Sequence, residues 1–119
     1  MKKLQANRVC VSDDGDYFQV LFEEEWDSLK NYFLIQRNFE YDYDEEPDPC
    51  YIETDNEGFC GHLDIEKAEL DRNRFYLKLA DKKDGEIEIT FQIRNENYLE
   101  AKRVLKIIFS GLDTLTITP

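Results

Sequence analysis

Apolar and polar residues alternate along most of this 119-residue chain, as they do in strands that have one buried face. The clearest example is EIEITFQI at 86–93, where isoleucine and phenylalanine alternate with glutamate, threonine and glutamine. Other runs rich in β-branched and aromatic residues are separated by turn sequences that contain Asp, Asn and Gly. These runs predict further strands at 5–11, 17–24, 31–37, 50–54, 61–70, 74–80 and 115–118.

The segment after residue 93 has the helical period instead. Its apolar side chains fall on one face, while basic side chains lie towards the opposite face and the C-terminal end. The apolar face comprises Tyr98, Ala101, Val104, Leu105, Ile108 and Phe109. We expect Asn97 or Asn95 to cap the start of this helix and Gly111 to follow its end.

These elements predict an α+β fold in a single domain that spans residues 1–119. We expect a mostly antiparallel β-sheet meander of about seven strands, with one C-terminal helix packed on it. A hydrophobic share of 41% is enough for the chain to bury a core of its own.

The net charge of −12 is concentrated in the first half of the chain. Residues 1–66 contain 18 Asp and Glu against five Lys and Arg, whereas residues 67–119 contain nine against ten. Phosphate binding requires Lys and Arg, so this balance argues against a nucleic acid or an anionic membrane as the partner. An acidic surface would instead attract a basic protein. The alternative is that the charge only keeps the protein soluble.

Acidic residues are densest between residues 40 and 48, directly after the predicted strand at 31–37. Tyrosines alternate with carboxylates there, and tyrosine supplies a large contact area at a low entropic cost. Pro47 and Pro49 stiffen the segment, which lowers the cost of ordering it on binding. We predict a partner-binding surface formed by Glu40, Tyr41, Asp42, Tyr43, Asp44, Glu45, Glu46 and Asp48. The alternative is that the tyrosines pack on the sheet and the carboxylates face water.

The same segment invites comparison with a calcium-binding loop. Counted from Asp42, positions 1, 3, 5 and 12 are Asp42, Asp44, Glu46 and Glu53, which all offer oxygen ligands. An EF-hand needs glycine at position 6, where this chain has Pro47, and it needs flanking helices rather than strands. No metal site is therefore predicted, and a weak, irregular Ca²⁺ site is the alternative.

Residues suited to catalysis are scarce in this sequence. His62 is the only histidine, and a nucleophile pair of Cys60 and His62 on one strand would be poorly aimed. A zinc site made from Cys50, Cys60 and His62 would lack a fourth ligand. We predict neither an enzyme nor a cofactor.

The expected compartment is the cytoplasm. No signal peptide and no apolar run long enough for a membrane span is found in the sequence. The three cysteines have no CxxC spacing, and free thiols fit a cytoplasmic protein better than disulfides. A bond between Cys50 and Cys60 is nevertheless geometrically conceivable.

Three stretches carry short motifs: YFLIQR at 32–37, CYIE at 50–53 and NEGFCGHLDI at 56–65. In this order they resemble the L-x-L-Q-R-like strand, the glutamate-bearing strand and the glycine-rich turn of the bacterial immunity protein 10 family. We interpret the residues that carry the likeness as framework, namely Gln36, Arg37, Glu53, Gly58 and Gly61. The chain departs from the family's pattern after Gly61, where it has a histidine, a leucine and an aspartate.

The resemblance implies an immunity protein of a polymorphic toxin system, which is a cytoplasmic antidote that binds a cognate toxin domain and blocks it. A toxin that cleaves nucleic acid needs a basic cleft, and an acidic surface could occupy that cleft. The alternatives are a small acidic Ca²⁺- or ligand-binding accessory domain and an acidic nucleic-acid mimic that inhibits host enzymes.

Overall fold

The computed structural model describes residues 2–13, 17–24, 31–38, 50–55, 59–80 and 83–118. Within these ranges the chain forms ten strands and one helix. In chain order they are β1 (Lys2–Ala6), β2 (Arg8–Asp13), β3 (Tyr17–Glu23), β4 (Tyr32–Asn38), β5 (Cys50–Thr54), β6 (Gly61–His62), β7 (Ile65–Asp71), β8 (Arg74–Leu79), β9 (Glu86–Phe91), α1 (Asn95–Ile108) and β10 (Leu115–Ile117).

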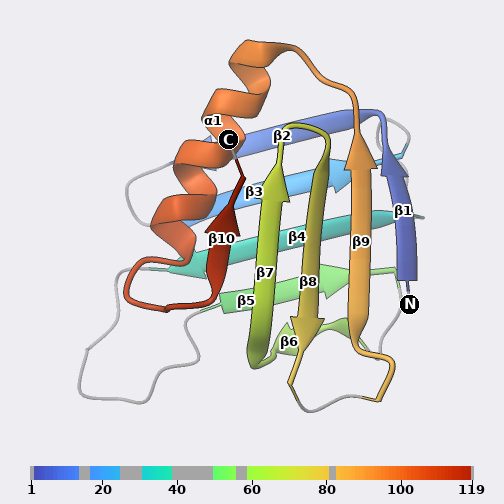
Figure 1. The fold of residues 1–119 in the computed structure, drawn as a ribbon, viewed down its shortest axis with the longest axis vertical. Helices are drawn as coiled ribbons and strands as arrows, with labels where there is room; N and C mark the ends of the chain where they lie inside the picture. Colours follow the sequence, from blue (N-terminus) through green and yellow to red (C-terminus); the bar gives the residue numbers. More distant parts are fainter. Residues whose placement is uncertain are drawn as a thin grey trace.

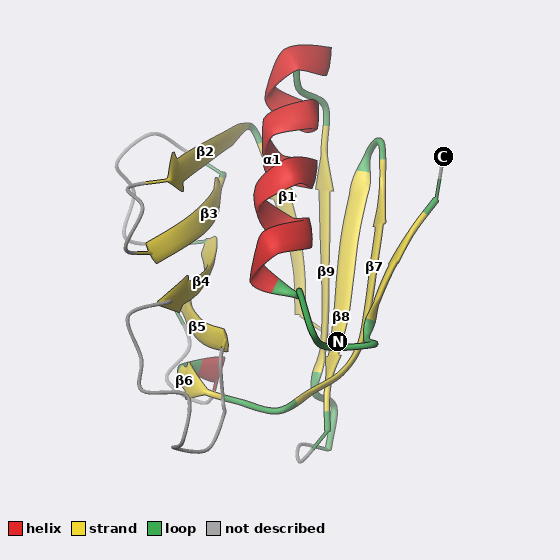
Figure 2. Cartoon of the chain, turned by 90° about the vertical axis from the view of Figure 1, so that its left-hand side faces the viewer, coloured by secondary structure: helices red, strands yellow, loops and turns green. Residues whose placement is uncertain are grey.

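The strands build two sheets that face each other, and α1 lies between them at one side (Figures 1 and 2). Sheet A has the order β1-β9-β8-β7-β10, and sheet B has the order β2-β3-β4-β5-β6. The strands of sheet B run across those of sheet A in Figure 1. The predicted α+β class with a C-terminal helix is confirmed. The prediction of one meander of about seven strands is wrong, because the strands divide between two sheets.

The first change of sheet occurs at Asn7, inside the stretch 5–11 that alternation predicts as one strand. β1 ends before Asn7 in sheet A, and β2 begins after it in sheet B. The backbone N–H of Asn7 donates to the carbonyl of Glu23 at 2.9 Å, and its side-chain Nδ2 donates to the carbonyl of Glu24 at 2.9 Å. Both halves are strands, so periodicity alone does not reveal this corner.

The chain returns to sheet A inside the stretch 61–70, which the sequence predicts as one strand paired with 50–54. The two residues of β6 pair with β5, and β7 then begins at Ile65 in sheet A. The crossing segment is tied to sheet A by the backbone N–H of Ala80, which donates to the carbonyl of Asp64 at 2.9 Å. The predicted hairpin is therefore much shorter than its sequence suggests.

Sheet B is antiparallel throughout, but sheet A is mixed. Its strands β7, β8 and β9 form an antiparallel meander, while β1 pairs with β9 and β10 pairs with β7 in parallel. Parallel neighbours need a long connection. All of sheet B lies in sequence between β1 and β9, and β8, β9 and α1 lie between β7 and β10. Sheet A is thus bordered by strands from both ends of the chain.

The core between the sheets is built around phenylalanines. Phe22 and Phe33 come from sheet B, Phe75 and Phe91 come from sheet A, and all four are buried. The ring of Phe22 stacks on that of Phe75 with 5.7 Å between centres, and it lies 5.6 Å from the ring of Phe91. Phe109, just after α1, meets Phe75 edge-on at 6.5 Å. Such ring contacts stabilise a core beyond the area that they bury.

Helix α1 closes one side of this core. Its buried face consists of Tyr98, Ala101, Val104, Leu105 and Ile108, as the helical period predicts. The predicted asparagine cap is wrong, because Asn95 is the first helical residue and the preceding Arg94 makes no side-chain capping hydrogen bond. Instead, Arg72 donates to the carbonyl of Ile93 at 2.6 Å and lies 5.0 Å from the centre of the Tyr98 ring. In the described ranges, no helix has the length and apolar character needed to cross a membrane.

We expect Phe75→Ala to lower the free energy of unfolding by about 3–5 kcal/mol, because it opens a cavity where both sheets and the end of α1 meet. Thr90→Ala is the control, since Thr90 is exposed on the neighbouring strand β9 and should change stability by less than about 1 kcal/mol. Urea unfolding followed by circular dichroism measures both values. Equal losses in the two variants would contradict a central role for this ring.

Candidate functional site

The predicted partner-binding residues, at 40–48, lie outside the described residues. The segment connects β4 and β5, which are antiparallel neighbours in sheet B, and the flanking strand ends pair Arg37 with Cys50. Three of the four positions of the alternative calcium loop lie in the same segment, and only Glu53 is described. Of the predicted binding region, the structure therefore describes the flanking strands of sheet B, and the candidate site is built from them.

Sheet B turns one face towards sheet A and the other away from it (Figure 2). Successive residues of a strand point to opposite faces, so burial of Phe33 and Ile35 in β4 and of Ile52 in β5 directs their neighbours outward. None of the described strands, nor α1, packs on this second face. We call it the outer face of sheet B, and its half-buried residues include Gln19, Leu21, Tyr32, Leu34, Gln36, Tyr51 and Glu53.

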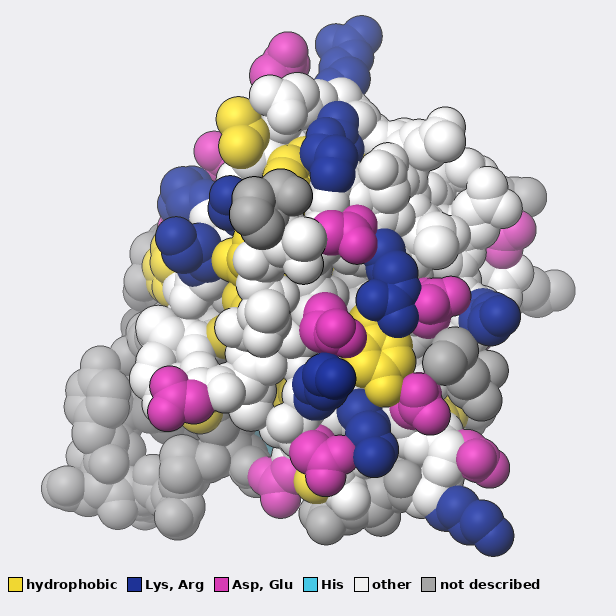
Figure 3. Space-filling view, in the orientation of Figure 1, with side chains coloured by type: hydrophobic (Ala, Val, Ile, Leu, Met, Phe, Trp, Pro, Cys, Tyr) yellow, Lys and Arg dark blue, Asp and Glu magenta, His cyan; other side chains and the backbone are white. Residues whose placement is uncertain are grey.

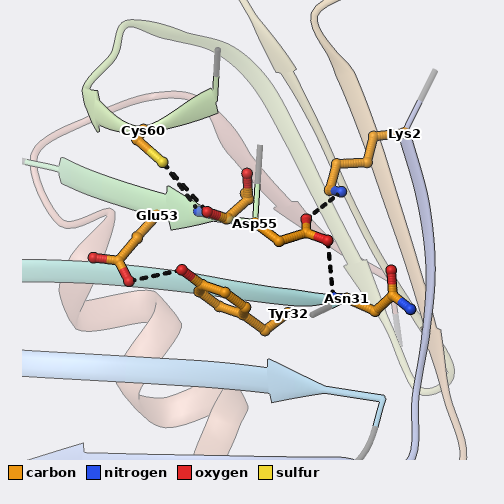
Figure 4. A network of polar contacts seen from close by, with 7 residues as sticks. Lys2, Asn31, Tyr32, Glu53, Asp55 and Cys60 are labelled. Atoms are coloured by element: carbon orange, nitrogen blue, oxygen red, sulfur yellow. Dashed lines mark hydrogen bonds and ion pairs between the residues drawn. The ribbon is translucent and has the colours of Figure 1, made fainter. Parts of the chain in front are cut away.

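Two tyrosines from different strands hold the carboxylate of Glu53 on this face. The hydroxyl of Tyr32 donates to Oε2 at 2.9 Å (Figure 4), and the hydroxyl of Tyr51 donates to Oε1 at 3.0 Å. Burial, followed by the hydrogen bond to Glu53, raises the pKa of Tyr32 to about 12. The same kind of hydrogen bond, followed by burial, raises the pKa of Tyr51. Both hydroxyls therefore keep their protons, and act as donors, well above neutral pH.

A second carboxylate, Asp55, lies two residues further along and has a different environment (Figure 4). The ammonium of Lys2 lies 2.7 Å from Oδ1, and the backbone N–H of Asn31 donates to Oδ2 at 2.9 Å. These two hydrogen bonds, with that of Lys2 the larger, lower the pKa of Asp55. Lys2 belongs to sheet A and Asp55 follows β5, so this ion pair connects the two sheets.

The framework residues Gln36 and Arg37 point to opposite faces of β4. Gln36 lies on the outer face of sheet B, opposite Tyr51 in the register. Nη1 of Arg37 donates to the carbonyls of Ile108 at 2.9 Å and Ser110 at 2.6 Å. Carbonyls at the end of a helix lack partners within it and carry partial negative charge. Arg37 thus joins β4 to the end of α1.

Gly61, another framework residue, is explained by its backbone conformation, whereas Gly58 lies outside the described residues. The φ of Gly61 is +124°, which is strained for residues that have a side chain. No atom lies within 4 Å of the position that a Cβ would take, so lack of space is not the reason for this glycine. Gly111, predicted to follow the helix, has a φ of +82° two residues after the C-cap Phe109.

The single histidine and its neighbouring cysteine have separate contacts. The thiol of Cys60 lies 3.4 Å from the carbonyl oxygen of Thr54 and 3.5 Å from its backbone N (Figure 4). The ring of His62 meets that of Tyr51 edge-on at 5.5 Å. No disulfide joins the three cysteines, so the conceivable bond between Cys50 and Cys60 is not formed. Over the described residues, no three His, Cys, Asp or Glu side chains come together as metal ligands would.

The sequence alone does not identify Tyr32 and Tyr51 as partners of Glu53. Within YFLIQR and within CYIE, the alternation of apolar and polar residues does predict which side chains lie on the buried face of the strand and which lie on the opposite face. It does not give the register across the acidic segment, which sets Leu34 opposite Glu53 and brings the two tyrosines to one carboxylate. The family motif identified Glu53 without its partners.

The described residues form an α+β domain of two sheets and one helix, with carboxylates and tyrosines on the outer face of sheet B. A comparison with known protein families assigns this domain to a family. The family model described as Immunity protein 10 matches residues 5–104. The chain therefore belongs to the immunity protein 10 family, which confirms the resemblance in the sequence and supports the role of an immunity protein. No curated protein matches the chain.

We expect Arg37→Met to lower the free energy of unfolding by about 1.5–3 kcal/mol, because it keeps the apolar stem but removes the charged donor from two helix-end carbonyls. Arg94→Met is the matched control, since Arg94 is exposed at the other end of the same helix and should cost less than about 0.5 kcal/mol. Chemical unfolding of the two variants beside the parent chain measures the difference. A tie between β4 and α1 would be refuted if both variants behaved alike.

The raised tyrosine pKa values predict how stability depends on alkaline pH. An unfolded tyrosine ionises near its ordinary pKa of 10.0, whereas Tyr32 and Tyr76 in the folded chain ionise near 12. Between these values the unfolded state holds fewer protons, so the free energy of unfolding should fall as pH rises from 10 to 12. Tyr32→Phe should make this fall shallower, and Tyr76→Phe should do so by a similar amount. Unfolding curves across this pH range that keep the parent slope in both variants would contradict the prediction.

Proposed function

We propose that this immunity protein binds a cognate toxin domain and blocks its activity by contact rather than by catalysis, in the cytoplasm. The match to the immunity protein 10 family over residues 5–104 carries the proposal. Three cysteines without a disulfide suit a reducing compartment.

The distribution of charge over the fold supports a basic surface on the toxin. Residues 8–62 supply every strand of sheet B and the sequence between them, and they contain 16 Asp and Glu against three Lys and Arg. The rest of the chain contains 11 against 12. The excess negative charge thus belongs to the part of the chain that builds sheet B. A charged surface of this kind speeds the encounter with a surface of opposite charge.

The acidic segment 40–48 is the part of this region that we assign to first contact with the toxin. It contains six carboxylates, and it is attached at both ends to neighbouring strands of sheet B. A charge excess of this size acts over about 10 Å at moderate ionic strength. Its alternating Tyr41 and Tyr43 offer contact area once the surfaces meet. The segment and the outer face of sheet B are therefore proposed as parts of one binding region.

Replacing Asp42, Asp44 and Glu46 together by lysine should abolish protection against the toxin and slow association by roughly tenfold or more at low salt, because the attraction becomes a repulsion. Protection is measured by growth of cells that express the polypeptide encoded immediately upstream of this chain's gene. Association rates are measured with that polypeptide as an inactive variant, by surface plasmon resonance.

The control for charge alone replaces Asp64, Glu66 and Asp113 by lysine. All three are exposed and lie outside sheet B, and the net charge changes by the same amount. This variant should still protect cells and should associate nearly as fast as the parent chain. Full protection by the variant at Asp42, Asp44 and Glu46 would overturn the assignment of the acidic segment.

A further inference from the structure

The half-buried carboxylate of Glu53 accepts its hydrogen bonds from neutral groups. Tyr32 and Tyr51 each supply one hydroxyl, at 2.9 Å and 3.0 Å. An ionised carboxylate offers about four acceptor positions, so this pair of hydroxyls leaves room for further donors. Among the described Lys and Arg residues, none forms an ion pair with Glu53. The described part of the chain thus orients this negative charge without compensating it.

Asp55 shows the contrast within one segment of the chain. Its carboxylate has an ammonium at 2.7 Å and a backbone N–H at 2.9 Å, and both contacts connect parts of the fold (Figure 4). A cation of the chain itself therefore meets the carboxylate that joins the sheets. Among the described residues, Glu53, two residues earlier, accepts hydrogen bonds from side chains of its own sheet.

The outward face of sheet A is built differently from the outer face of sheet B. Figure 3 shows its Lys and Arg side chains interspersed with Asp and Glu. Arg74 pairs with Glu88 at 2.8 Å and also lies over the ring of Tyr76, 4.9 Å from its centre. The hydroxyl of Tyr76 in turn donates to Glu86 at 2.8 Å. Sheet A thus has a tyrosine–carboxylate contact of the same kind, but on a face where both signs of charge alternate.

Apolar side chains border Glu53 on its own face. The register places Leu34 directly opposite Glu53 and Leu21 directly opposite Leu34, so the two leucines extend from the carboxylate across β4 and β3. Both leucines are half-buried. Tyrosine is enriched at the centre of protein interfaces, whereas charged residues are few there, so a single carboxylate among tyrosines and leucines would act as one specific contact rather than as part of a charged rim.

We propose that the outer face of sheet B docks the toxin domain and that Glu53, positioned by Tyr32 and Tyr51, accepts a Lys or Arg side chain of the toxin. This inference rests on the proposed function, to which it adds the face and the anchoring residue. A basic protein surface fits because an anion would be repelled by Glu53, and a purely apolar surface would bury the carboxylate with its two tyrosine hydroxyls but without a cation. Docking covers Leu21 and Leu34, and exclusion of water from around the charge pair strengthens it.

Glu53→Gln tests the proposal, because it keeps the shape of the side chain and its capacity to bond both tyrosines but removes the charge. We expect its affinity for the inactive upstream-encoded polypeptide to fall by about 30-fold or more, mainly through faster dissociation. Glu86→Gln makes the same change at the tyrosine-bound carboxylate of sheet A and should alter the affinity by less than about twofold. Surface plasmon resonance measures the dissociation and association rates separately. Slower association, by contrast, is the effect expected when Asp42, Asp44 and Glu46 of the acidic segment are replaced by lysine.

Leu34→Lys provides a second variant that leaves Glu53 in place. It sets an ammonium directly opposite the carboxylate, so it should compete with the toxin's cation and weaken binding to a similar degree. Circular dichroism and a cooperative unfolding transition establish that each variant is folded. If the folded Glu53→Gln and Leu34→Lys chains bind as tightly as the parent, or if Glu86→Gln weakens binding as much as Glu53→Gln, the docking face is overturned while the proposed function stands. If the parent chain neither binds the upstream-encoded polypeptide nor protects cells from it, the proposed function is overturned, and the docking inference falls with it.

Discussion

The fold depends on the contact between the phenylalanines of its two sheets. Phe22 from sheet B packs against Phe75 and Phe91 from sheet A, and Phe75 in turn meets Phe109 at the end of α1. Sheet B is formed by one continuous part of the chain, residues 8–62, whereas sheet A combines β1, which precedes that part, with β7 to β10, which follow it. The aromatic core is therefore what makes the two sheets one structure. Lys2 with Asp55, and Arg37 with the carbonyls of α1, reinforce it at the periphery.

The core also determines the outer face of sheet B, because the two faces of a strand are not independent. With Phe33 and Ile35 buried, the pleat directs Leu34 and its alternate neighbours away from sheet A. The same alternation in β5 directs Glu53 outward. A shift of register by one residue would move every one of these side chains to the opposite face. The cluster of tyrosines around Glu53 is therefore held by the packing of the hydrophobic residues behind it.

The strands and the helix could be predicted from periodicity because each buries one face, and the buried face of α1 consists of residues that the period predicts. The division into two sheets could not be predicted from periodicity, since residues on both sides of Asn7 form strands. The corner at Asn7 depends on hydrogen bonds to the end of β3, which is distant in sequence. The prediction of an asparagine N-cap is wrong for a similar reason, because the start of α1 is held by Arg72, which is remote in sequence. Motifs marked Arg37 and Glu53 as important. Their roles follow only from the partners that tertiary structure brings to them.

The two carboxylates at the end of β5 differ in whether a described cation of the chain lies beside them. Asp55 has its cation within the chain, so its charge is used to hold sheet A against sheet B. Glu53 has two hydroxyl donors, which lower the cost of holding a half-buried charge while leaving most of its field uncompensated within the described structure. In the docking that we propose, a cation of the partner would meet a fixed carboxylate and would displace no cation of the described residues. Because neutral donors orient the charge in advance, less entropy is lost on binding than for a free glutamate side chain.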